Sequence, residues 1–108
     1  MKVAFYARVS SQRQEIEETI ETQIMAVKDF VKANNHTLVQ EYRDDRWSGT
    51  ILARPALDQL RLDVSKKLWE AIVVYDPDRL SRKYAHQALV IEELESRGVV
   101  VLFVTTPQ

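Results

Sequence analysis

Serine and arginine side chains follow the first apolar segment of the chain. The segment Lys2–Ala7 (KVAFYA) is rich in strand-forming residues and runs directly into Arg8, Val9, Ser10 and Ser11. A serine hydroxyl among guanidinium groups is a candidate nucleophile for phosphorus, because these groups pair with phosphate oxygens and stay charged. The two serines would serve equally well in a turn or as a helix cap. The residues alone leave both interpretations open.

Arginines are concentrated in three polar segments, at residues 7–14, 43–54 and 76–83. Seven of the nine arginines lie there, against only one of the six lysines, Lys83. The seven are Arg8, Arg13, Arg43, Arg46, Arg54, Arg79 and Arg82. Ion pairing within these segments is the alternative, but their four aspartates cannot neutralise seven arginines (Asp44, Asp45, Asp76 and Asp78). We therefore expect a binding site for phosphate groups.

Arg79 and Arg82 are three residues apart, close to a helix that is predicted to begin near Ser81. On a helix this spacing places both side chains on one face. The N-terminus of a helix adds N–H groups and the positive end of a dipole. A phosphate bound there would therefore meet two arginines as well as the helix dipole. Taken in isolation, the pentapeptide DRLSR is more typical of an ordinary capped helix with exposed basic residues.

Four apolar segments are predicted to be strands, at residues 2–7, 37–42, 71–75 and 99–104. Helices are predicted between them, at residues 15–34, 55 to about 67, and from about 81 to 97. This alternation predicts an α/β fold: a single-domain, three-layer αβα structure with a mainly parallel sheet. We expect the strand order 2-1-3-4, in which the first strand lies between the second and the third. Ligands of such sheets bind beyond the carboxyl ends of the strands, where the three arginine-rich segments emerge.

Composition excludes several classes of protein. The 108 residues suit one domain, and the absence of cysteine excludes disulfides, thiolate nucleophiles and thiolate metal sites. His36 and His86 lie far from the serines in sequence, and no group of ligating residues has metal-site spacing, so neither a Ser-His-Asp triad nor a metal or cofactor is expected. No segment suits a membrane span or a signal peptide, which favours a cytoplasmic protein. The net charge of −1 argues mildly against strong DNA binding.

Three motifs together resemble the catalytic domain of serine site-specific recombinases, the resolvase/invertase superfamily. They are YARVSS near the N-terminus, SG followed by RPALDQL, and YDPDRLSR. They occur in the order and with the spacing of that family, and the resemblance covers essentially the whole chain. The long SGTILARPALDQL segment is more similar to the large serine integrase and transposase branch than to the small resolvases.

The resemblance implies a DNA strand-transfer reaction through a covalent 5′-phosphoserine intermediate, in site-specific recombination or transposition. It implies Ser10 as nucleophile, Arg8, Arg79 and Arg82 around the scissile phosphate, Arg54 as a further active-site arginine, and Asp78 to orient an arginine or handle a proton. Supporting positions are Ser11 beside the nucleophile, Gln14 and Gln23 as polar site residues, and Ser48 in a loop motif with Gly49. It implies no metal ion.

In this family a long dimerisation helix and a separate DNA-binding region follow the catalytic core. This chain ends at VLFVTTPQ, so we expect it to be a fragment, residues 1–108, of a longer recombinase that forms a homodimer and a synaptic tetramer. We expect the fragment alone to bind DNA weakly.

Two other interpretations share the same fold. One is a catalytically silent regulatory module that retains the site residues. The other is a flavodoxin-like module that binds a phosphate or nucleotide, which would be expected to carry a glycine-rich turn after the first strand. The segment ARVSSQRQ contains no glycine, which argues against nucleotide binding.

Overall fold

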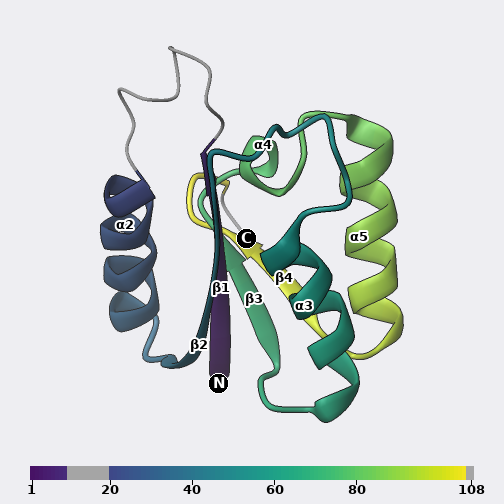
Figure 1. Ribbon diagram of the computed structural model, residues 1–108. Coiled ribbons are helices and arrows are strands. Elements are labelled where there is room, and N and C mark those ends of the chain that lie inside the picture. Colours follow the sequence, from purple (N-terminus) through teal and green to yellow (C-terminus); the bar gives the residue numbers. More distant parts are fainter. Residues whose placement is uncertain (10–19, 107–108) are drawn as a thin grey trace.

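The computed structural model describes residues 1–9 and 20–106, which form one parallel four-stranded sheet with helices on both faces (Figure 1). The strands are β1 (Lys2–Val9), β2 (Thr37–Asp45), β3 (Ala71–Val74) and β4 (Val100–Phe103). The helices are α2 (Ile20–Ala33), α3 (Pro55–Asp63), α4 (Pro77–Leu80) and α5 (Tyr84–Ser96), and a 3-10 helix at Val64–Lys66 extends α3. The strand order β2-β1-β3-β4 confirms the predicted order and fold class.

Two hydrophobic layers explain why the central strands lack alternating polarity. Val3, Phe5 and Ala7 of β1 pack with the apolar stripe of α2, on one face of the sheet (Figure 1). Ala4 and Tyr6 of the same strand belong to the cluster formed with α3 and α5 on the other face. Because both faces are covered, every residue from Val3 to Val9 is buried.

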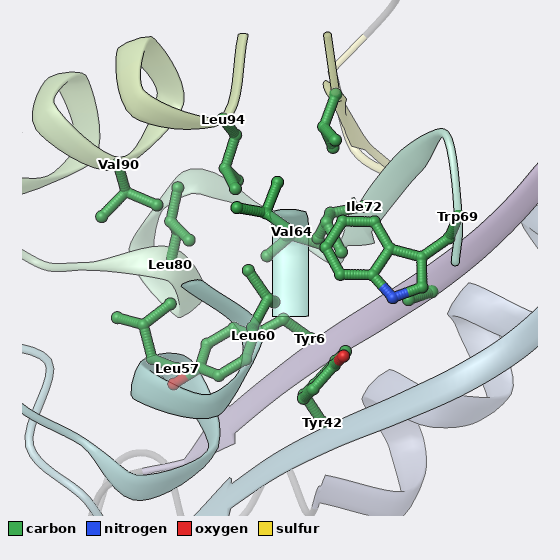
Figure 2. Packing of buried hydrophobic residues seen from close by; sticks show 13 residues of the cluster. Tyr6, Tyr42, Leu57, Leu60, Val64, Trp69, Ile72, Leu80, Val90 and Leu94 are labelled. Carbon is green, nitrogen blue, oxygen red and sulfur yellow. The ribbon is translucent and has the colours of Figure 1, made fainter. Parts of the chain in front are cut away.

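The cluster on the α3 and α5 side of the sheet includes Tyr6, Tyr42 and Trp69 (Figure 2). Tyr42 meets the edge of the Trp69 ring with centroids 6.1 Å apart, and its hydroxyl donates to an Asp63 carboxylate oxygen at 2.7 Å. Burial, aided by the bond to Asp63, raises the pKa of Tyr42 to about 12. This core fixes α3 against β2, and thereby the polar loop that connects them.

The predicted helix near Ser81–Arg97 is wrong at its start. The chain forms the short helix α4 over Pro77–Leu80, leaves helical geometry at Ser81 (φ −166°, ψ 149°), and begins α5 at Tyr84. Pro77 and the Asp76 cap start α4, and the Ser81 hydroxyl leaves the helix to bond the Gly49 carbonyl oxygen at 3.0 Å. A tertiary contact therefore interrupts a segment whose local pattern is helical.

The other boundaries differ by a few residues. β1 continues through Val9 and β2 through Asp45, further than predicted, because the two strands stay paired to Val9↔Asp45. α3 ends at Asp63, and the following 3-10 turn closes at Lys67, which takes a left-handed conformation (φ 55°). Residues 15–19 of the first predicted helix lie outside the described residues. None of the helices in the described ranges is long and apolar enough to cross a membrane.

Candidate active site

The carboxyl ends of β1, β2 and β3 lie at one edge of the sheet. There Arg8 of β1 contacts the two arginine-rich segments that follow β2 and β3. The loop after β2 begins at Arg46, which has a left-handed backbone (φ 63°), and the next residue, Trp47, donates its N–H to the Val9 carbonyl oxygen at 3.0 Å. α4 follows β3 and contacts β1. Ser10, Ser11, Arg13 and Gln14 lie outside the described residues.

Arg8 is fully buried and bonds backbone carbonyls of both neighbouring segments. Its Nε donates to the Arg79 carbonyl at 3.2 Å, and its Nη2 donates to the Asp78 carbonyl at 2.7 Å. Its Nη1 donates to the Trp47 carbonyl at 3.0 Å. The guanidinium group therefore joins α4 to the loop after β2, directly beside the point where β1 leads to Ser10.

Gln23 of α2 fixes the backbone of Arg8. Its amide nitrogen donates to the Arg8 carbonyl oxygen at 3.0 Å, and its amide oxygen lies 3.4 Å from the Arg8 N–H. Gln23 is 1% exposed, so this bond pair lies in the interior. Of the two candidate glutamines, Gln23 is thus seen to contact the site.

Arg54 is also fully buried and lies directly before α3. Its Nη1 donates to the Tyr6 hydroxyl oxygen at 3.0 Å, and its Nη2 donates to the Leu80 carbonyl oxygen. Its Cζ lies 5.6 Å from the centre of the Tyr6 ring. Within the described residues, no acceptor bonds its buried Nε.

Asp44 connects the end of β2 to the start of α3. One carboxylate oxygen accepts from the Ala56 N–H at 2.8 Å, and the other accepts from the Leu57 N–H at 3.0 Å and from the Tyr6 hydroxyl at 2.8 Å. Burial is the main cause that raises the pKa of Tyr6 well above its ordinary value, and the neighbouring Asp44 adds to it against the opposing effect of Arg54. Tyr6 is therefore a neutral phenol at physiological pH.

The arginines of the DRLSR segment do not share a helix face, which corrects the expectation from their spacing. Arg79 belongs to α4 and is 6% exposed, whereas Arg82 follows the extended Ser81 and is half-buried. At the start of α4, the Arg79 N–H is taken by the Asp76 carboxylate at 3.1 Å. The Asp78 side chain is exposed, and the backbone carbonyl oxygen of Asp78 accepts a hydrogen bond from Arg8.

Gly49 allows the loop after β2 to lie against two arginines. A Cβ atom at this position would lie 2.7 Å from Nη2 of Arg8 and 2.6 Å from Cγ of Arg82. The Gly49 carbonyl oxygen accepts the Arg82 N–H at 3.0 Å. The neighbouring Ser48 hydroxyl bonds the Thr50 hydroxyl at 2.8 Å, so Ser48 shapes the loop.

The described hydrogen bonds of Arg8 and Arg54 go to carbonyl oxygens and a phenol. Arg79 forms an ion pair with an aspartate, its Nε lying 4.0 Å from the Asp76 carboxylate. Arg43 instead pairs with exposed Glu41 at 2.6 Å. The site is thus a cluster of cationic side chains that bond backbone carbonyl oxygens. Such a cluster is suited to binding an oxyanion.

Sequence reasoning missed the supporting residues Tyr6, Asp44, Trp47 and Ser81. The sequence analysis places Asp44 in the polar segment after the second predicted strand, whereas it lies at the end of β2 opposite Arg8. The alternation of β1 could have directed attention to Tyr6, because Ala4, Tyr6 and Arg8 are successive residues on one side of the strand. In the described ranges, no three potential metal ligands of the His, Asp or Glu type lie close enough to hold an ion.

Comparison with known proteins supports this description. Residues 3–108 match the family model described as "Resolvase, N terminal domain". A Bacillus subtilis (strain 168) protein named as a DNA recombinase is 42% identical over 103 residues, which cover 94% of this chain and 20% of that protein. The Escherichia coli transposon Tn3 resolvase is 36% identical over 105 residues, 96% of this chain and 50% of the resolvase.

A solved structure of the N-terminal catalytic domain of TP901-1 integrase is 28% identical, with a TM-score of 0.89. The match covers 96% of this chain and 77% of that one. This chain therefore spans one half or less of the two curated relatives but most of a separately solved catalytic domain.

Proposed function

Because this chain belongs to the resolvase family and corresponds to its N-terminal domain, we propose that it is the catalytic domain of a serine recombinase. In this proposal it cleaves and rejoins DNA through a covalent 5′-phosphoserine intermediate. The observation that carries the proposal is the buried arginine cluster at the end of β1, the strand that Ser10 follows in the sequence.

The proposed chemistry is an in-line displacement at phosphorus. The Ser10 hydroxyl oxygen forms a bond to phosphorus, the bond from phosphorus to the 3′-oxygen breaks, and the 5′-phosphate stays on Ser10. The proton leaves the serine oxygen as the bond forms, and the departing 3′-oxygen takes up a proton. Rejoining reverses these steps with a new 3′-hydroxyl, so no external energy source is consumed.

The arginines supply charge for this reaction. Phosphoryl transfer depends mainly on positioning and on stabilising charge spread over the phosphate oxygens. We assign this work to Arg8, Arg54, Arg79 and Arg82, and we propose that Asp78 orients an arginine or handles a proton. Gln23 supports Arg8 through its backbone, and Ser48 supports the loop that Gly49 brings against Arg8 and Arg82.

We also propose that residues 1–108 act within a longer protein. Recognition of a DNA sequence, dimerisation and assembly of a synaptic tetramer would then depend on regions beyond this domain. Those regions would also decide whether the outcome is integration, excision or transposition. A cytoplasmic location and contact with DNA fit a protein of this class.

Substitution of the two serines tests the proposal. In the full-length protein, Ser10→Ala is expected to abolish cleavage of recombination-site DNA, because no nucleophile remains. Ser11→Ala is the matched control and should retain cleavage, measured on denaturing gels. Cleavage retained in Ser10→Ala would contradict the assignment, whatever the result in Ser11→Ala. No cleavage by wild-type protein that binds this DNA would favour a silent regulatory or phosphate-binding module.

A further inference from the structure

We propose that Arg46 binds a DNA phosphate that flanks the scissile one. The inference rests on the proposed function, because it names a further contact between the catalytic domain and DNA. Arg46 is exposed and directly follows β2, at the edge of the sheet where Arg8 bonds the next residue of the loop. Its side chain forms no hydrogen bond or ion pair within the part of the chain that the structure describes.

Arg46 has a left-handed backbone (φ 63°), which is sterically unfavourable for any residue that carries a Cβ atom. In the described ranges, the other non-glycine residues with positive φ are Asn35 and Lys67. Asn35 follows α2 and Lys67 ends the 3-10 helix, and a left-handed residue is usual at the end of a helix. Arg46 instead follows a strand, so helix capping does not explain its conformation.

The hydrogen bonds of Trp47 explain the conformation of Arg46. The Trp47 N–H donates to the Val9 carbonyl oxygen at 3.0 Å, and the Trp47 carbonyl oxygen accepts from Arg8 Nη1 at 3.0 Å. These two bonds hold the chain in its turn after β2, and glycine would adopt the same turn without the steric cost. An arginine at position 46 therefore lowers stability, and strain of this kind at a candidate site points to a function for the side chain.

A DNA phosphate is the partner that fits this position. Arg46 is adjacent in sequence to Trp47, which bonds Arg8, and neighbouring Cα atoms lie about 3.8 Å apart. Successive phosphates of one DNA strand follow each other at about 3.4 Å along the helix axis. If the buried arginines hold one phosphate, an exposed guanidinium group beside them lies within reach of a neighbouring phosphate. Its planar donors suit two oxygens of that phosphate.

Lys67 provides a matched control for a test on Arg46. It is also basic, exposed and left-handed, with φ 55°. It lies in the connection from the 3-10 helix to β3, at the opposite end of the sheet from the loop after β2 (Figure 1). Arg46→Gly and Lys67→Gly each remove one positive charge and one unfavourable side chain, but only Arg46→Gly removes a cation beside the candidate active site.

The first measurement compares stability with DNA binding. Tm is measured on the 108-residue chain, and affinity of the full-length protein for recombination-site DNA is measured by fluorescence anisotropy at several salt concentrations. Each glycine variant is expected to raise Tm by about 4 °C. Only Arg46→Gly is expected to weaken binding, by about 5- to 10-fold at about 100 mM salt, and to reduce the slope of log affinity against log salt by about 0.9. Arg46→Lys keeps the charge and should keep most of the slope.

The second measurement locates the phosphate. A series of DNA duplexes carries one neutral methylphosphonate each, at successive positions on both sides of the cleavage point. One flanking substitution is expected to weaken wild-type binding about 5- to 10-fold and to change Arg46→Gly by less than about twofold, because the contact is already absent there. Lys67→Gly should respond like the wild type. If Arg46→Gly does not fold, Arg46→Asn removes the same charge and also suits a left-handed backbone.

Each outcome decides the inference. Equal salt slopes for the wild type and Arg46→Gly would overturn it, as would equal sensitivity of both proteins to every substituted phosphate. A Tm of Arg46→Gly below that of the wild type would also overturn it, because the arginine would then serve stability. The same loss of affinity in Lys67→Gly would show a general effect of charge and no specific contact. If the wild-type protein binds its DNA and forms no adduct on Ser10, the proposed function fails, whereas the affinity comparison still decides whether Arg46 contacts a phosphate.

Discussion

Gly49 shows at the scale of a single residue how closely the site is packed. Its backbone lies against the Arg8 guanidinium group and the Arg82 stem, where a Cβ atom would come within 3 Å of both side chains. Its φ angle is not in the left-handed range, so close approach, rather than backbone freedom, explains the glycine. Gly98, in contrast, has φ 80°, and a Cβ atom there would have no other atom within 4 Å.

This contrast gives the first prediction. Gly49→Ala should destabilise the protein by about 1 to 3 kcal/mol through overpacking and should also impair DNA cleavage, because Arg8 and Arg82 must shift. Gly98→Ala should lower stability by about 1 to 2 kcal/mol through backbone strain and leave cleavage intact. Chemical denaturation and a cleavage assay measure the two effects. Full cleavage by Gly49→Ala would contradict this account of the loop.

The second prediction concerns the alkaline stability of the core. The pKa of Tyr42 is raised to about 12 in the folded protein, while an unfolded tyrosine titrates near 10. The contribution of the neutral Tyr42 to stability is therefore fully present below about pH 10 and is lost as pH rises to about 12. The fall in the free energy of unfolding across this range should be smaller in Tyr42→Phe. The same pH dependence of the free energy of unfolding in the wild-type protein and in Tyr42→Phe would contradict the assignment of this loss to Tyr42.

At the scale of elements, the loop after β2 carries a natural probe of the site. Trp47, whose backbone bonds both Val9 and Arg8, is 38% exposed, whereas the only other tryptophan, Trp69, is 3% exposed in the core. An oligonucleotide bound at the arginine cluster should quench Trp47 emission, because nucleobases and phosphate would lie beside the indole. Trp47→Phe should abolish the quenching. Quenching that persists in this variant would place the DNA elsewhere.

The elements were predictable where the determining pattern is local. The apolar segments around Phe5, Ile72 and Val101 predict three strands, and their alternation with helices predicts a parallel sheet. The break at Ser81 was not predictable, because a hydrogen bond to Gly49, 32 residues away, decides it. The same holds for Asp44, which acquires its role only when Tyr6 and α3 pack beside it.

The candidate site, like the fold, was predictable from the sequence only in part. Residue types predicted that arginines would gather at the ends of the strands, and Arg8 and Arg54 both bond the main chain of α4, the helix that carries Arg79. Their burial was not predictable, since sequence patterns associate arginine with surfaces. Arg8 and Arg54 are accepted into the interior only because folded segments offer acceptors, such as the carbonyl oxygens of Asp78 and Leu80.

At the scale of the whole molecule, the charge balance limits what this domain does alone. The net charge is −1, and the two fully buried arginines donate hydrogen bonds to carbonyl oxygens. With 15 basic against 16 acidic residues, the chain has no excess of positive charge to displace counterions from DNA. We expect the 108-residue chain to bind duplex DNA with a Kd of about 100 µM at physiological salt, with a shallow salt dependence. Titration by fluorescence anisotropy checks this, and sub-micromolar binding with a steep salt slope would contradict it.

The central claim is that Ser10 attacks a DNA phosphate within the arginine cluster. The most direct measurement incubates the full-length protein with recombination-site DNA that carries a nick to trap cleavage, then maps the adduct by mass spectrometry after digestion. We expect a 5′-phosphate linked to Ser10. Protein that binds this DNA as an assembled complex and forms no adduct, or forms one on another residue, would contradict the claim.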